Sequence, residues 1–328
     1  HLSLRRQRQM CIRDSSSAIR EPGNECNMKA INNYFLATRP SFLTITLLGC
    51  LIGLLSSGNL NQQHWGINLM AVGVAVFTHA AANVLNDYFD HLNGSDSNNL
   101  DRIPPFTGGS RFIQEKTFKP KEIFQFGLLL LLVSMCIGLY ICYLSTWTLL
   151  PIGILCIALA WMYSAPPFEL MSHGLLGELA IALSWALIVI GFASLQSNSL
   201  DIAAIPIALA YGFMVANILF LNQIPDIQAD KSSRKMTLAV QSEPKNLWDW
   251  YLAFPVSAYA LQIVSFYFGL TTFYTLATIL VTPIFIQCAI KLKNREINKP
   301  LMSTIIPLNI LGVHLYALLL CAGLLIKT

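Results

Sequence analysis

Charged residues are scarce in this chain. Only 12% of its 328 residues are Asp, Glu, Lys or Arg, whereas 55% are hydrophobic and the mean hydropathy is +0.56. Because a soluble globular domain usually has about a quarter of its residues charged, this composition excludes an ordinary soluble protein. The net charge of +4 is small, and it gives no indication of nucleic-acid binding.

Cysteine motifs are also lacking. None of the eight cysteines belongs to a CxxC pair, and six of them lie in long apolar runs. We therefore interpret them as small apolar residues rather than as metal ligands or disulfide partners.

The first 27 residues lack both an initiating Met and the apolar core of a signal peptide. They are polar, unlike the rest of the chain, and Met28 opens a plausible start. We expect residues 1–27 to be a non-native or disordered leader, and residues 28–328 to form a single transmembrane domain.

Apolar runs of about 20 residues are abundant, and each is long enough to cross a bilayer. The sequence predicts an all-α membrane protein with about nine transmembrane helices. The predicted spans are 38–57, 66–86, 123–144, 147–164, 175–195, 202–222, 250–269, 271–290 and 302–325.

Almost all basic residues lie on one side of the predicted membrane, the exceptions being Arg39 just inside the first span and Lys327 at the far end. The loops 58–65, 145–146 and 196–201 contain no Lys or Arg. Cytoplasmic loops carry an excess of these residues, so we place the basic segments in the cytoplasm. They are 1–37, 87–122, 165–174, 223–249 and 291–301.

Polar residues enter the apolar pattern where the second predicted span ends. His79, Asn83 and Asp87 are spaced by four residues and share one helix face, and Asp90 lies on a neighbouring stripe. Polar side chains in a membrane helix usually face the protein interior and serve a function. We interpret Asp87 and Asp90 as cation or ligand contacts, and the deeper His79 as a hydrogen-bonded core histidine.

The same arrangement recurs at the end of the sixth span. Asn222, Asp226 and Asp230 are spaced by four, so a continuing helix would place all three on one face. A helix C-terminus already carries partial negative charge, so carboxylates stacked there require a cation. Lys235 lies close by. These acids could simply pair with the adjacent lysines, but the repeat argues against that alternative.

Two further segments carry groups suited to an anion. In the loop 91–122, Gly108 and Gly109 free backbone N–H groups, and Arg111 offers a bidentate donor. Arg39 opens the first span beside Pro40, where it can reach an anionic ligand or anchor the helix at the interface.

The acid clusters, the anion-binding groups and the apolar interior together indicate a type of reaction. Magnesium prefers carboxylate oxygens and completes its shell with substrate phosphates, so two Asp clusters could hold a pyrophosphate through metal ions. The apolar interior would take a hydrocarbon chain. Departure of pyrophosphate from an allylic carbon leaves a carbocation, which a pocket without water protects from quenching.

The residues also resemble a known family. The stretches NVLNDYFDHLNGSD, DRIPPFTGGSRFIQE, YSAPPF and NQIPDIQADKSSRKMTLAV are similar to the UbiA superfamily of intramembrane prenyltransferases, over roughly residues 36–326. The resemblance implies two pseudo-repeated four-helix bundles plus one helix, with repeats at about 38–164 and 175–290. It also implies a Mg²⁺-dependent site at the cytoplasmic face of a bacterial inner membrane.

The resemblance carries residue roles as well. It implies a polyprenyl diphosphate and an aromatic acceptor as substrates, with the surrounding membrane lipid as a further partner. By this match, the metal-binding and catalytic positions are Asp87, Asp90, Asp226 and Asp230. Asn83, Asn222 and Lys235 fall on polar positions lining the same cavity. We expect the substrates to be bound by these three residues together with Arg39, Asp96, Arg102, Arg111 and Tyr163.

The motifs also bear on which acceptor the protein uses. The 4-hydroxybenzoate branch typically has a third Asp seven residues after the first, a position that Gly94 takes here, whereas Asp96 follows nine after Asp87. The pattern NDYxDxxxGxD followed by DRI is more similar to the 1,4-dihydroxy-2-naphthoate prenyltransferases of menaquinone synthesis. Pro104-Pro105-Phe106 and His173 depart from the family pattern in loops near the acceptor entrance, which leaves the acceptor open.

Several alternatives follow. The acceptor could be 4-hydroxybenzoate, homogentisate, a porphyrin-derived ring or a glycerol phosphate. A non-catalytic quinone-binding scaffold would not need complete metal-binding acids. A secondary transporter usually places its site near the bilayer midplane at broken helices, whereas these acids cluster at one predicted surface.

Overall fold

The computed structural model describes residues 22–57, 64–99, 101–294 and 296–326. Most of the predicted leader, residues 1–21, lies outside the described residues, and the first helix begins at Pro22. The described chain is mainly helical, with two strands of two residues each, in agreement with the all-α prediction.

The elements follow one another along the chain in a simple order. The α-helices are α2 (Pro22–Ala37), α3 (Pro40–Ser56), α4 (Trp65–Asn93), α5 (Ser95–Asn98), α6 (Pro120–Leu144), α7 (Leu149–Met162), α8 (Leu175–Ser197), α9 (Ile205–Gln223), α10 (Ile227–Ser232), α11 (Leu238–Gln241), α12 (Leu247–Tyr267), α13 (Thr282–Asn294) and α14 (Lys299–Leu325). The 3₁₀ helices are η2 (Leu170–Ser172), η3 (Ile202–Ala204), η4 (Pro244–Asn246) and η5 (Phe273–Val281), and the strands are β1 (His173–Gly174) and β2 (Met236–Thr237).

The protein is an integral membrane protein, but the predicted count of nine spans is not confirmed. In the described chain, six helices are long and apolar enough to cross a bilayer: α4, α6, α8, η3 with α9, η5 with α13, and α14. A seventh arises if α2 and α3, which meet at a 59° bend, count as one broken span. Each predicted segment contains a helix. However, α7 has only 14 residues, and α12 is rich in Trp and Tyr, which lower its mean hydropathy.

Local chemistry explains where several helices begin. Proline occupies the first turn of α3, α6 and α14, where its missing N–H costs nothing. At the start of α6, the backbone N–H of Lys119 donates to the Glu122 carboxylate at 2.8 Å. At the start of α14, the Asn298 side chain accepts from the N–H of Leu301 at 3.0 Å, which caps the helix.

The centre of the core lies where α8 packs against α9 and α3. A Cβ on Gly212 of α9 would lie 2.1 Å from the carbonyl oxygen of Ala182 on α8. A Cβ on Gly53 of α3 would lie 2.4 Å from the carbonyl oxygen of Val189. Only glycine permits such close backbone approach, which is how helices commonly pack inside membranes.

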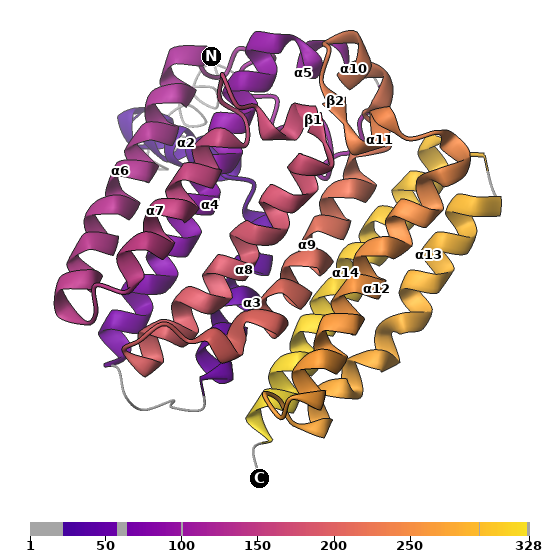
Figure 1. The fold of residues 1–328 in the computed structure, drawn as a ribbon. Coiled ribbons are helices and arrows are strands. Elements are labelled where there is room, and N and C mark those ends of the chain that lie inside the picture. Colours follow the sequence, from indigo (N-terminus) through magenta and orange to yellow (C-terminus); the bar gives the residue numbers. More distant parts are fainter. Residues whose placement is uncertain (1–21, 58–63, 100, 295, 327–328) are drawn as a thin grey trace, which may run out of the picture.

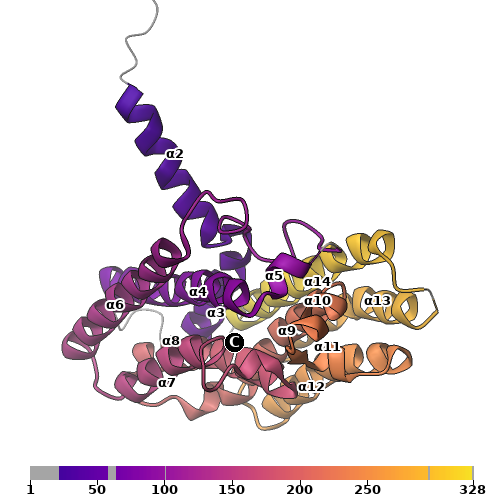
Figure 2. The same cartoon turned by 90° about the horizontal axis from the view of Figure 1, so that it is seen from above.

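The short elements gather at one end of the bundle. Figure 1 shows α5, α10, α11 and the two strands above the long helices, and Figure 2 shows α2 projecting away from the bundle. The strands pair in parallel, with His173 opposite Met236 and Gly174 opposite Thr237. This pairing joins the segment after α7 to the segment after α10, so that both halves of the chain meet at the same end.

Candidate active site

A cavity of about 650 Å³ runs between the helices from the end that carries the short elements. Along α4 its lining extends from Asp90 to Ala71, which at 1.5 Å per residue is roughly 28 Å. Below its polar end the walls are mostly aliphatic and aromatic side chains of α4, α6, α7 and α8. The predicted site residues that line the cavity are Arg39, Asn83, Asp90, Asp96, Tyr163, Asn222, Asp226, Asp230 and Lys235.

Lys235 joins the two predicted acid clusters. Its Nζ lies 3.0 and 3.1 Å from the two carboxylate oxygens of Asp90, which projects from α4. The same Nζ lies 3.8 Å from Oδ1 of Asp230 on α10. Asp90 and Asp230 are both buried. The two clusters, far apart in the sequence, therefore converge on one cationic side chain at the polar end of the cavity.

Asp226 is tied to the loop that follows α5. Asn99 Nδ2 donates to Asp226 Oδ1 at 2.7 Å, and Asn86 Nδ2 donates to Asp90 Oδ2 at 3.0 Å. Neither asparagine was among the predicted site residues. Asn86 lies on the same helix stripe as Asp90, so helical spacing could have identified it as a site residue. Asn99 lies in a loop, where no periodic pattern indicates which side chains face the site.

Asp87 is not itself among the residues that line the cavity, but it contacts Arg39 and Gly109, which are. Its carboxylate forms an ion pair with Arg39 and accepts from the backbone N–H of Ser110 at 3.2 and 3.3 Å. Gly109 has a φ of +71°, and a Cβ there would lie 3.0 Å from Asp87 and 2.7 Å from Asp96. The glycine loop predicted to bind a substrate anion thus lies against two of the protein's own carboxylates and donates the Ser110 N–H to one of them.

Two predicted substrate contacts do not reach the cavity. Arg111 donates to the backbone carbonyl of Asp96, and the Arg102 side chain lies against Gly108. Neither arginine is among the residues that line the cavity. Both belong to an irregular loop, whose path is set by tertiary contacts that residue spacing does not report.

The site is rich in buried charge. Burial, together with the like charges of Asp90 and Asp87, raises the pKa of Asp96 to about 7. Burial also raises the pKa of Asp230 to about 7, although Lys235 opposes the shift. For Lys235, burial alone would lower the pKa, but Asp90 and Asp230 outweigh it and raise the pKa above its usual value. Carboxylates crowded in this way attract cations.

The donor set fits a hard divalent cation that shares its shell with a ligand. The available donors are carboxylate and amide oxygens, and Oδ1 of Asn222 is buried without a hydrogen-bond partner in the described chain. Among the described residues, no group of three or more His, Cys, Asp or Glu lies close enough to hold a metal alone. Mg²⁺ meets this condition, because it takes one or two carboxylates and completes its shell with water and phosphate.

The fold and the cavity together define an integral membrane protein with buried acids at the mouth of a long apolar slot. Residues 43–324 match the model of the UbiA prenyltransferase family. The chain belongs to this family, and it is a prenyltransferase.

Similar proteins agree with this membership. A 1,4-dihydroxy-2-naphthoate octaprenyltransferase of Mycobacterium leprae is 27% identical over 240 residues, which cover 72% of this chain and 78% of the relative. The protein of that name from Mycobacterium tuberculosis is 27% identical over 217 residues, covering 65% and 71%. A UbiA homolog from Archaeoglobus fulgidus, solved with DMAPP and Mg²⁺, has a TM-score of 0.60 at 13% identity and covers 88% of this chain and 99% of its own. At that identity the likeness concerns the fold.

Proposed function

We propose that this protein transfers a polyprenyl group from a prenyl diphosphate to an aromatic acceptor, with Mg²⁺, at the cytoplasmic face of a bacterial inner membrane. The observation that carries the proposal is the bridging of Asp90 and Asp230 by Lys235 at the polar mouth of an otherwise apolar cavity. A diphosphate head with a hydrocarbon tail has the same division into a charged end and an apolar end.

Different residues would bind the two ends of the substrate in the cavity. Asp87, Asp90, Asp226 and Asp230 would hold Mg²⁺, which when bound neutralises the charge of the departing diphosphate. Lys235 would exchange part of its contact with Asp90 for a phosphate oxygen. The apolar walls would hold the tail and exclude water.

The transfer itself needs few groups. The bond between C1 of the prenyl chain and the diphosphate oxygen breaks, and its electron pair leaves with the diphosphate. A ring carbon of the acceptor then bonds to C1, and the ring releases the proton or substituent that the new bond replaces. The protein contributes mainly position and electrostatics to these steps.

We further propose that α3, α7 and α12 also cross the membrane, which gives nine spans in two four-helix repeats plus one. The absence of Lys and Arg from the loops 58–65, 145–146 and 196–201 supports this topology. It would place Asp90 and Asp226 at the cytoplasmic surface.

The acceptor we propose is 1,4-dihydroxy-2-naphthoate, as the names of the Mycobacterium relatives suggest. Membranes containing the protein, given octaprenyl diphosphate and a panel of 1,4-dihydroxy-2-naphthoate, 4-hydroxybenzoate and homogentisate, should prenylate the naphthoate fastest. Mass spectrometry identifies the product, and membranes without the protein are the control. Preference for another ring would correct the acceptor. If none of the three acceptors were prenylated, the proposed transfer to an aromatic acceptor would be wrong.

Replacing Lys235 should weaken binding of the diphosphate far more than binding of the acceptor. We expect Lys235→Met to raise KM for prenyl diphosphate about ten- to a hundredfold, because a buried charged partner is lost. KM for the acceptor should change less than threefold. The exposed neighbour Lys231 gives a matched control in Lys231→Met, and Lys235→Arg should recover part of the loss. An equal rise in KM for both substrates would contradict this placement of Lys235.

A further inference from the structure

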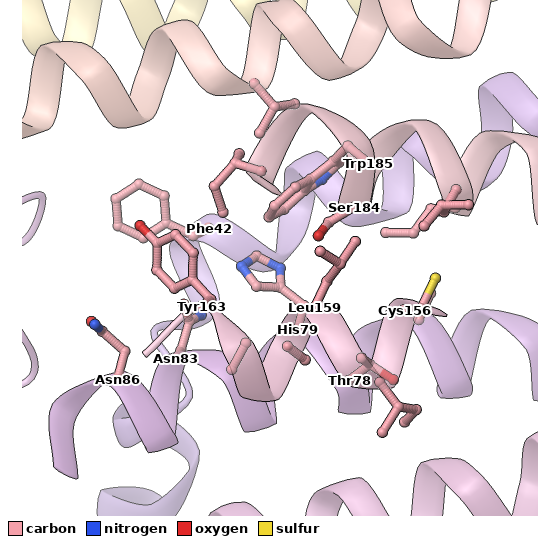
Figure 3. A pocket seen from close by; sticks show the side chains of 18 of the residues that line it. Phe42, Thr78, His79, Asn83, Asn86, Cys156, Leu159, Tyr163, Ser184 and Trp185 are labelled. Atoms are coloured by element: carbon pink, nitrogen blue, oxygen red, sulfur yellow. The ribbon is translucent and has the colours of Figure 1, made fainter. Parts of the chain in front are cut away.

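His79 lies at the boundary between the polar and the apolar part of the cavity. It lies on α4 one turn deeper than Asn83, roughly 6 Å along the helix axis. Figure 3 shows Asn83, Asn86 and Tyr163 on one side of its ring, and Thr78 and Cys156 on the other. The layer of His79 is therefore where the polar mouth gives way to the apolar slot.

The imidazole ring is held in a fixed orientation by two other helices. Nδ1 lies 2.7 Å from Oγ1 of Thr46 on α3, and the ring meets Trp185 of α8 edge to face at 4.8 Å between centroids. The hydrogen bond that the sequence predicts for His79 is thus confirmed. The core position is only half right, because the residue is half-buried and lines the cavity.

The second ring nitrogen remains unused by the protein. Within the part of the chain that the structure describes, Nε2 of His79 has no hydrogen-bond partner. Trp185 beside it has an indole N–H that is buried without a partner in the same described residues. An unpaired ring nitrogen of a cavity-lining histidine and a buried, unpaired indole N–H therefore lie in one layer of the cavity. Because buried polar groups left unpaired are costly, they point to a ligand with polar atoms.

A prenyl chain cannot be that ligand, because it contains only carbon and hydrogen beyond the diphosphate. A ring hydroxyl can, since it both donates and accepts. It therefore suits Nε2 whichever nitrogen of His79 holds the proton, a choice that the contact with Thr46 leaves open. The aromatic rings of Phe42 and Tyr163 line the same part of the cavity and would cover the faces of a planar acceptor.

We propose that Nε2 of His79 binds a ring hydroxyl of the acceptor and so positions the ring beside C1 of the prenyl diphosphate. The diphosphate is held at Asp90 and Asp226, so C1 lies just below the polar mouth, next to the layer of His79. This inference rests on the proposed transfer to an aromatic acceptor, and it identifies the residue that binds the acceptor's hydroxyl.

The first test compares His79→Phe with His79→Gln. Phenylalanine fills the space of the imidazole without a polar atom, whereas glutamine places an amide near the position of Nε2. We expect His79→Phe to raise KM for the acceptor about ten- to a hundredfold, as expected for loss of a buried hydrogen bond. KM for the prenyl diphosphate should stay within twofold, and His79→Gln should recover part of the loss. An unchanged acceptor KM in His79→Phe would overturn the inference.

The second test changes the ligand instead of the protein. Acceptors with a single ring hydroxyl methylated are compared with the parent acceptor in the wild type and in His79→Phe. In the wild type, methylation of the contacted hydroxyl should raise KM about ten- to a hundredfold. In His79→Phe the parent and its ethers should bind equally. If methylation raises the acceptor KM by the same factor in both proteins, whichever hydroxyl is methylated, His79 does not contact the acceptor.

The outcomes separate this inference from the proposed function. Wild-type protein that prenylates no ring acceptor refutes the function, and the inference falls with it. Wild-type protein that is active, with a His79→Phe variant that has the same acceptor KM, refutes the inference alone. An unchanged KM for prenyl diphosphate shows that the variant is folded. If His79→Phe does not fold, the same ligand comparison in His79→Gln decides, because a weakened dependence on the hydroxyl is expected there too.

Discussion

Removing divalent cations with EDTA should abolish prenyl transfer, and adding Mg²⁺ in excess should restore it. Asp90, Asp96 and Asp230 are buried close to one another, and a diphosphate would bring more negative charge into the same space. At such distances like charges repel strongly where water is scarce. Without a metal the head group should therefore not bind, so both binding and turnover are lost.

The measurement has two parts. Product formation is followed with and without EDTA, and binding of prenyl diphosphate is followed separately by thermal stabilisation of the purified protein. EDTA already saturated with Mg²⁺ is the control for effects of the chelator itself. Full activity in EDTA, or diphosphate binding that ignores Mg²⁺, would refute the metal-dependent mechanism.

Replacing one acid from either cluster should lower activity almost as much as removing the divalent cations. We expect Asp87→Asn and Asp226→Asn each to lower kcat/KM by about a hundredfold to a thousandfold or more, the range found when one electrostatic contact to the transition state is removed. Asparagine keeps the shape of the side chain but not its charge, so the variants should still fold and insert.

Turnover of purified variants, together with their thermal unfolding, provides the test. Asp249→Asn, at an exposed position in the first turn of α12, is the matched control and should remain near wild type. Near-normal turnover of Asp226→Asn would contradict its role. For Asp87 the outcome is informative in a second way. It contacts Arg39 and Ser110 rather than the cavity, so a loss limited to diphosphate binding would assign it to positioning the glycine loop.

The positions of the two acid clusters could be foreseen from the sequence, because the same local pattern of Asn and Asp occurs twice in it. The four-residue spacing of Asn83 and Asp87 fixes one face of α4 without reference to the rest of the chain. For the second cluster the expectation of one continuing helix was wrong, because α9 ends at Gln223 and Asp230 lies in the separate helix α10. The family resemblance was likewise inferred from the sequence of these motifs, and it is confirmed by the match over residues 43–324.

Loop residues were harder to place. Arg102 and Arg111 were expected at the substrate, yet one lies against Gly108 and the other binds the backbone of Asp96. Asn99, which donates to Asp226, was missed. Irregular segments have no period, so their side chains can point in any direction that the packed helices allow.

The sequence by itself therefore determined that this is a helical membrane protein of the UbiA family, and which face of α4 carries its first acid cluster. Composition, run length and helical spacing are properties of neighbouring residues, and a linear chain displays them directly. The tertiary structure alone decided that Lys235 bridges Asp90 to Asp230 and that His79 faces the cavity between Thr46 and Trp185. These contacts join separate helices, and only the packing of the bundle fixes which side chains meet.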